Sequence, residues 1–247
     1  MILGLLVLGA ALAIGFVVYN YVVAQRRREA LQVFAMSRRW TYRAADDRYA
    51  TRWSGQPFAD GTNRRARNVI TGTTGGFPVV AFDYSYETES TDSDGDRSRT
   101  THRYAVTALV MPGYLPRLSV TPESALSRVG AALGAADIEL ESEAFNRRFR
   151  VTCPDRKFAS DALVPRTMEL LLARSPLHWR MEGSEILCWE VGSHTPVQIL
   201  ERASTLAAVV GGIPSFVWQD HGAQPPVAAR PTAQPYRSAP IPGSSTS

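Results

Sequence analysis

The first 24 residues form an almost unbroken apolar run, and three arginines, Arg26–Arg28, follow it almost at once. Residues 2–19 contain no charged side chain. A helix over residues 2–24 would measure roughly 34 Å at about 1.5 Å per residue, which is enough to cross a hydrocarbon core of about 30 Å. The sequence therefore predicts one transmembrane helix over residues 1–24.

A cleaved signal peptide is the competing interpretation of this run. It would need a basic start, an apolar stretch of about 7–15 residues and a small-residue cleavage site. No basic residue precedes the run, and the small residues at Ala11 and Ala13 are followed by more apolar residues. We therefore expect a retained anchor. Ala11 and Gly15 also have the spacing that lets two such helices pack as a homodimer.

The arginines predict the orientation of the anchor. Basic residues next to a span are retained on the cytoplasmic side. Arg26, Arg27 and Arg28 are therefore the membrane-orienting residues, and we expect a single-pass protein of the inner (plasma) membrane with its soluble domain in the cytoplasm.

Charge argues against a nucleic-acid partner, although the net charge is +4 and the pI about 9.3. Five of the 27 basic residues are Arg26–Arg28, Arg230 and Arg237, whereas all 23 acidic residues lie within 29–220. The soluble domain is thus close to neutral. It lacks the clustered basic stripe that phosphate backbones require.

Metal, redox and nucleotide chemistry have no sequence signature here, so we expect no cofactor. Cys153 and Cys188 have neither metal-site nor redox-pair spacing, and the four histidines are scattered. The Asp92–Asp96 segment lacks the glycine and glutamate positions of a calcium loop, and the Gly72–Gly76 segment lacks the lysine of a phosphate loop. A buried apolar role is expected for both cysteines.

The patterning of residues 25–247 predicts an α+β fold with mostly antiparallel sheet and about three helices. Residues 25–39 form a basic juxtamembrane helix, 40–218 form the domain, and 219–247 form a disordered proline-rich tail. Two short aromatic strands are expected in 40–53, and a three-strand meander in 69–110.

The second half of the domain contains helix start signals and strand alternation. Thr-Pro pairs at 121–122 and 195–196 predict helices over 121–133 and 195–212. Alternation over 137–153 predicts two strands that pair Glu with Arg. Helices are expected over 158–163 and 165–173, and a hairpin over 178–191.

One stretch resembles a known type of protein. Residues 143–151 (EAFNRRFRV), 158–159 (FA) and 163–171 (LVPRTMELL) resemble a segment of uncharacterised, membrane-anchored proteins of actinobacterial type. The resemblance implies a membrane location and a domain that folds as a unit. It brings no activity, cofactor or catalytic residue.

These observations favour a non-catalytic binding or scaffold module held at the lipid bilayer by its anchor, with a protein partner at the membrane. The surface predicted for that partner lies in 145–172 and consists of Phe145, Asn146, Arg148, Arg150, Arg166 and Glu169. The alternative is a membrane-anchored hydrolase with a carboxylate site, which requires several acids in one cleft. Its candidate acids are Glu139, Glu141, Asp161 and Glu169.

Overall fold

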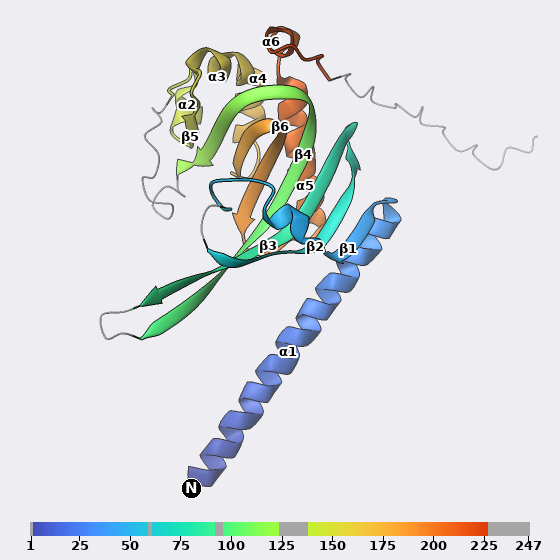
Figure 1. The fold of residues 1–247 in the computed structure, drawn as a ribbon, viewed down its shortest axis with the longest axis vertical. Coiled ribbons are helices and arrows are strands. Elements are labelled where there is room, and N and C mark those ends of the chain that lie inside the picture. Colours follow the sequence, from blue (N-terminus) through green and yellow to red (C-terminus); the bar gives the residue numbers. More distant parts are fainter. Residues whose placement is uncertain (1, 59–60, 92–95, 124–137, 227–247) are drawn as a thin grey trace, which may run out of the picture.

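The computed structural model describes residues 2–58, 61–91, 96–123 and 138–226, and only the backbone of 2–11 and 13. Its first element is one long helix, α1 (Ile2–Ser37), which extends away from the rest of the molecule (Figure 1). Within the described part of the chain, no helix combines the length and the apolarity required to cross a membrane. In the predicted span 1–24, the side chains of residues 1–11 and 13 lie outside this description.

The C-terminal turns of α1 belong to the folded domain. Leu31 and Ala35 are completely buried, and they pack with Ile70, Ala81 and Ile199 from the sheet and from a later helix. No break separates the predicted anchor from the predicted juxtamembrane helix. The helix therefore runs without a linker from its exposed N-terminal part into the core.

A six-stranded antiparallel sheet forms the centre of the domain, which confirms the predicted α+β class. The predicted meander is present as three consecutive strands, β2 (Thr62–Thr74), β3 (Phe77–Thr91) and β4 (Arg97–Pro122). Gly75 and Gly76 both have positive φ in the two-residue turn between β2 and β3, a conformation that glycine adopts without strain. Residues 40–53 hold one strand where two were predicted, β1 (Thr41–Ala45), followed by the 3-10 turn η1 (Asp47–Ala50).

Strand β4 is longer than its sequence pattern predicted, because it pairs with three strands. It pairs with β3, with β5 (Phe149–Thr152), and along most of its length with β6 (His178–Val191). The prediction that Thr121 and Pro122 begin a helix is wrong: Pro122 lies in β4 opposite Phe149. Residues 124–133 of that predicted helix lie outside the described chain.

Two further strand predictions are corrected. Residues 178–191 form one continuous strand and not a hairpin, because Gly183 (φ +65°) lies at a register shift opposite Leu115. Of the two strands predicted over 137–153, only β5 forms, and Glu143–Asn146 is the short helix α2. The expected Glu–Arg pairing across strands is replaced there by an ion pair one helical turn apart, between Glu143 and Arg147.

Three predicted helices are confirmed, namely α3 (Arg156–Ala162), α4 (Pro165–Leu172) and α5 (Pro196–Gly212). The capping box at the start of α5 is present, with Thr195 and Gln198 each accepting a backbone N–H of the other. Besides α1, the described chain has five α helices, whereas about three were predicted. The helices α2 and α6 (Ser215–Asp220) were missed because they are too short to show a helical period.

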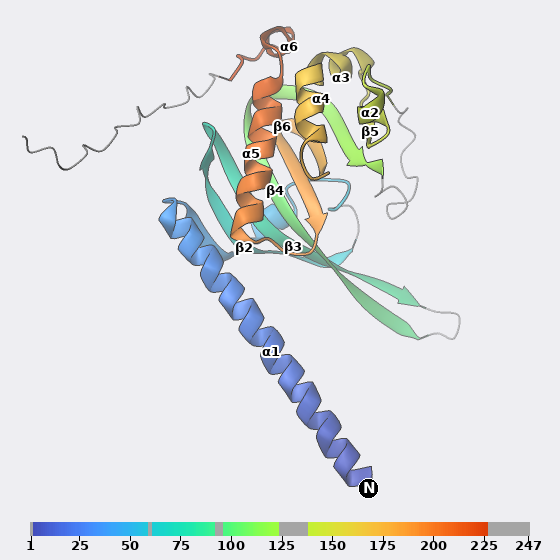
Figure 2. The same ribbon diagram turned by 180° about the vertical axis from the view of Figure 1, so that it is seen from behind.

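The two faces of the sheet are covered differently. Helices α4 and α5 cover one face (Figure 2), and the main core contains Leu109, Leu118, Leu206 and Val210. The opposite face is covered by the segment 46–58, in which Trp53 stacks on Phe82 of β3 and Phe58 packs at a tilt against Tyr84. Every strand at the centre is therefore buried on both sides, which suits its apolar composition.

The chain remains part of the fold beyond the predicted domain boundary at residue 218. After α6, Ala223 packs closely against Gly113 of β4. A Cβ atom added to Gly113 would lie only 2.2 Å from the Cβ of Ala223, so this contact requires glycine. The predicted tail 219–247 therefore begins within the folded domain, and residues 227–247 lie outside the described chain. The described chain ends near α6, whereas α1 extends from the opposite end of the domain (Figure 1).

Candidate functional site

An ion pair attaches α1 to the sheet. Arg27 lies on the face of α1 that meets the domain, and its Nη2 donates to both carboxylate oxygens of Asp83 in β3, at 2.7 and 2.5 Å. Its Nε donates to the carbonyl of His194 at 2.7 Å. The Arg27 and Asp83 side chains are 26% and 14% exposed, respectively, so solvent screens the pair only partly. The neighbouring Arg26 and Arg28 are exposed.

Asp83 has two further partners, so its carboxylate is held from several sides. Asn68 donates from its side-chain amide at 2.7 Å, and the backbone N–H of His194 donates at 3.0 Å. Asn68 adopts a positive φ of 49° at an irregularity in β2, a conformation that asparagine tolerates better than most residues. A charge within the apolar strand β3 is therefore fully paired, as a buried carboxylate must be.

The same network continues into the domain through His194. Its Nε2 donates to the carbonyl of Val106 at 2.8 Å, and its Nδ1 accepts from Arg202 at 3.1 Å. Burial, and then the positive charge of Arg202, lower the pKa of His194 to about 4. The ring is therefore neutral near pH 7 with both nitrogens occupied, so it cannot serve as a general base. Arg202 also donates to Glu190 of β6.

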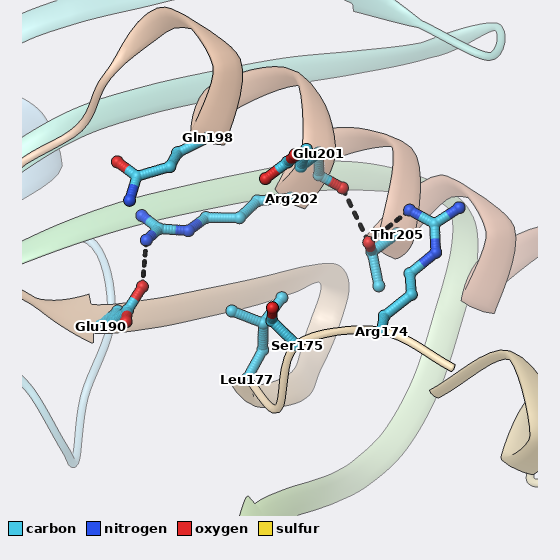
Figure 3. A pocket seen from close by; sticks show the side chains of 8 residues that line it. All are labelled: Arg174, Ser175, Leu177, Glu190, Gln198, Glu201, Arg202 and Thr205. Atoms are coloured by element: carbon cyan, nitrogen blue, oxygen red, sulfur yellow. Dashed lines mark hydrogen bonds and ion pairs between the residues drawn. The ribbon is translucent and has the colours of Figure 1, made fainter. Parts of the chain in front are cut away.

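Arg202 lines a cavity of about 340 Å³ between α5, the end of β6 and the loop that precedes β6 (Figure 3). The side chain of Arg174 on that loop donates to the hydroxyls of Ser204 and Thr205, at 3.2 and 2.9 Å. Because neutral hydroxyls hold this guanidinium, it retains its charge for a ligand. We call this cavity the α5–β6 groove; its lining residues are Arg174, Ser175, Leu177, Glu190, Gln198, Glu201, Arg202 and Thr205.

The predicted interaction surface is divided by the fold. Phe145 is completely buried, with its ring 4.9 Å from that of Phe149, so it cannot belong to an exposed surface. The reason is that residues 143–146 form the helix α2, which turns this side chain into the core. The predicted strand would have placed it at the edge of the sheet. Arg166 and Glu169 are exposed on α4, as that prediction required.

The other predicted surface residues serve the local structure. The Asn146 amide donates to the carbonyl of Leu140 and accepts its N–H, at 2.8 and 3.1 Å. Arg148 donates to the carbonyls of Leu172 and Arg174 at the end of α4, where a cation favours the helix dipole. Arg150 is half-buried in β5. Arg148, which lies between α2 and β5, thereby joins that segment to the end of α4.

The acids named for a hydrolase do not converge. Glu139, Glu141 and Glu169 are exposed, and Asp161 accepts a hydrogen bond from Lys157 at 2.6 Å on α3. None of the four lines the α5–β6 groove or the second cavity, which lies beside Gly113 and α6. The geometry that a two-carboxylate mechanism needs is thus not formed by these residues.

The described residues contain no group of three or more His, Cys, Asp or Glu side chains that could hold a metal ion. Cys153 and Cys188 are free and buried. Burial raises the pKa of Cys188 to about 12 and also raises that of Cys153, so both thiols stay protonated near pH 7.

Sequence reasoning missed Asp83, His194, Arg202 and Arg174. One signal was available: Asp83 is a lone charge in the apolar run 77–86, and such a charge requires a partner. Nothing in the sequence identified Arg27 as that partner, because it lies 56 residues away along the chain.

Comparison with known proteins yields a similar fold only. No family model and no curated protein sequence matches the chain. The crystal structure of the mycobacterial trehalose monomycolate transport factor A is similar, with a TM-score of 0.55 and 14% identity. The alignment covers 76% of this chain and 96% of that one. At this identity the likeness shows a shared fold.

Proposed function

We propose that this chain is a single-pass membrane protein whose α+β domain is a non-catalytic binding module in the cytoplasm, auxiliary to a membrane transport process. The bilayer and a protein partner at the membrane are its proposed contacts. We also propose that the chain is related to the membrane-anchored proteins of actinobacterial type that residues 143–171 resemble.

One observation carries the membrane part of the proposal. Between Leu12 and Val23, nine large apolar side chains of α1 are 38–69% exposed, and they cover all sides of the helix. A free helix that is apolar all round is stable when lipid surrounds it, whereas a helix lying on a protein has one polar face. Residues 2–11 continue this composition in the sequence.

The binding role is supported by what the domain contains and by its similar structure. The α5–β6 groove presents a positioned guanidinium, Arg174, which donates to the hydroxyls of Ser204 and Thr205. Such a site suits recognition of an anionic group on a partner. The protein of similar fold is described as a trehalose monomycolate transport factor, and we propose a related auxiliary role in transport for this chain.

Two measurements test this proposal. Alkaline phosphatase fused after Ser247 should be inactive, and a green fluorescent protein fused there should fluoresce, with both proteins recovered in the membrane fraction. Recovery in the soluble fraction after high-speed centrifugation, or an active phosphatase, would overturn it.

The partner is tested by crosslinked co-purification from membranes. We expect Arg174→Glu, in the groove, to lose the recovered partner, and the matched control Arg156→Glu, exposed on α3 and outside both the groove and the predicted surface, to retain it. Equal recovery with both variants would exclude the groove as the contact.

A further inference from the structure

The loop between β6 and α5, residues 192–195, lies beside the arginines of α1. The carbonyl of His194 in this loop accepts a hydrogen bond from Arg27 Nε at 2.7 Å. Arg26 and Arg28, the sequence neighbours of Arg27, are exposed. If a bilayer surrounds the apolar part of α1, the arginines lie at its headgroup level. The loop is then within one side chain's length of the lipid surface.

Two exposed apolar side chains border this loop. Val191 at the end of β6 is 72% exposed, and Val197 at the start of α5 is 64% exposed. Both elements reach the end of the domain from which α1 extends (Figure 1). The exposed Arg103 belongs to the same end, because its carbonyl accepts the N–H of Gly192 at 2.9 Å.

The charge at this end favours an anionic surface. Asp83 is paired with Arg27, and Glu190 with Arg202, so neither carboxylate is uncompensated. Glu29 accepts a hydrogen bond from Gln25 and is the remaining acid on this part of α1. Exposed Arg26, Arg28 and Arg103 together outweigh it. In the hairpin of β3 and β4, Glu87 and Glu89 both pair with Arg99. Apolar side chains set among arginines are the composition of a surface that binds anionic lipid.

We propose that Val191, Val197 and the loop between them form a second contact with the lipid bilayer, in which both valines enter the headgroup region and Arg26, Arg28 and Arg103 face lipid phosphates. This inference rests on the membrane anchor of the proposed function. Because Arg27 and the buried Leu31 attach α1 firmly to the domain, the anchor brings this surface to the membrane in one orientation. The polar hairpin of β3 and β4 extends at the same end and approaches the bilayer with it (Figures 1 and 2).

The test places a fluorophore at these positions in the full chain. Single cysteines are introduced as Val191→Cys or Val197→Cys, labelled with a nitrobenzoxadiazole dye, and reconstituted into vesicles of phosphatidylcholine and phosphatidylglycerol. The native Cys153 and Cys188 are buried, so labelling selects the new thiol. The matched control is Tyr114→Cys, since Tyr114 is also 72% exposed and lies near α6, at the other end of the domain.

We expect blue-shifted emission and severalfold stronger quenching by nitroxide-labelled lipid at positions 191 and 197 than at 114. Quenching should weaken in vesicles without phosphatidylglycerol and with Arg103→Glu. Protein that floats with the vesicles while all three positions remain equally water-exposed would overturn the inference and leave the anchor intact. A blue shift without lipid quenching would mean that a second protein copy covers the valines, and would also overturn it. Protein that does not float would instead refute the proposed function.

Discussion

Replacing Arg27 by alanine tests whether this residue holds α1 to the domain, in addition to the orienting role proposed for it. The substitution removes three hydrogen bonds, two to Asp83 and one to the carbonyl of His194. Breaking a fully buried ion pair by removing one partner costs about 3–5 kcal/mol. Because Arg27 is 26% exposed and Asp83 keeps its bonds from Asn68 and His194, we expect a loss of about 2 kcal/mol.

The matched control is Arg26→Ala, because Arg26 carries the same charge at the same membrane distance and is exposed. Both variants remove one of the arginines proposed to orient α1, so any effect on membrane topology should be equal. Of these two arginines, Arg27 is the one that contacts Asp83. We therefore expect Arg26→Ala to change the free energy of unfolding by less than about 0.5 kcal/mol.

The assay is urea unfolding of the full chain in detergent micelles, followed by tryptophan fluorescence. With a slope of about 2 kcal/mol per M, the midpoint for Arg27→Ala should fall by about 1 M. A double-mutant cycle with Asp83→Asn should give a coupling energy of about 1–2 kcal/mol. Equal midpoints for the Arg26→Ala and Arg27→Ala variants would refute the reasoning, because the ion pair would then contribute nothing.

Three further predictions concern the domain itself. Lowering the pH from about 6.5 to about 4 should reduce the free energy of unfolding by up to about 3 kcal/mol, because the unfolded chain protonates His194 while the buried ring does not; a pH series of unfolding curves with His194→Gln should lack this component. Gly72→Ala should cost about 1–3 kcal/mol, because its new Cβ would lie 2.3 Å from the Trp40 ring, and a thermal unfolding curve that matched the unaltered protein would contradict that contact. Phe145→Ala should cost about 3–5 kcal/mol, as a buried aromatic side chain does, and Arg166→Ala less than about 0.5 kcal/mol in the same unfolding assay.

Local signals predicted the elements that depend on neighbouring residues. The capping box at Thr195 and the proline at position 165 located the starts of α5 and α4 correctly, because capping involves only the first helical turn. The meander of β2, β3 and β4 was also predictable, since short turns join strands of alternating pattern.

Long-range pairing decided the elements that were predicted wrongly. Residues 178–191 have the pattern of a hairpin around Gly183, yet they form one strand because β4 pairs with them on both sides of that glycine. Pro122 read as a helix start, yet it lies opposite Phe149 at the end of β4. The sequence shows a glycine or a proline, and the partner strand decides whether it makes a turn or lies in a strand.

By itself, the sequence of this protein determined the apolar composition of its N-terminal helix, the near-neutral domain and the positions of its strongest helix caps. Only the tertiary structure decided that Arg27 pairs with Asp83, that Phe145 is buried, and that His194 is neutral between Val106 and Arg202. The physical reason is range. Hydrophobicity and capping act between neighbours along the chain, whereas burial and ion pairing depend on residues that approach one another only when the sheet has formed.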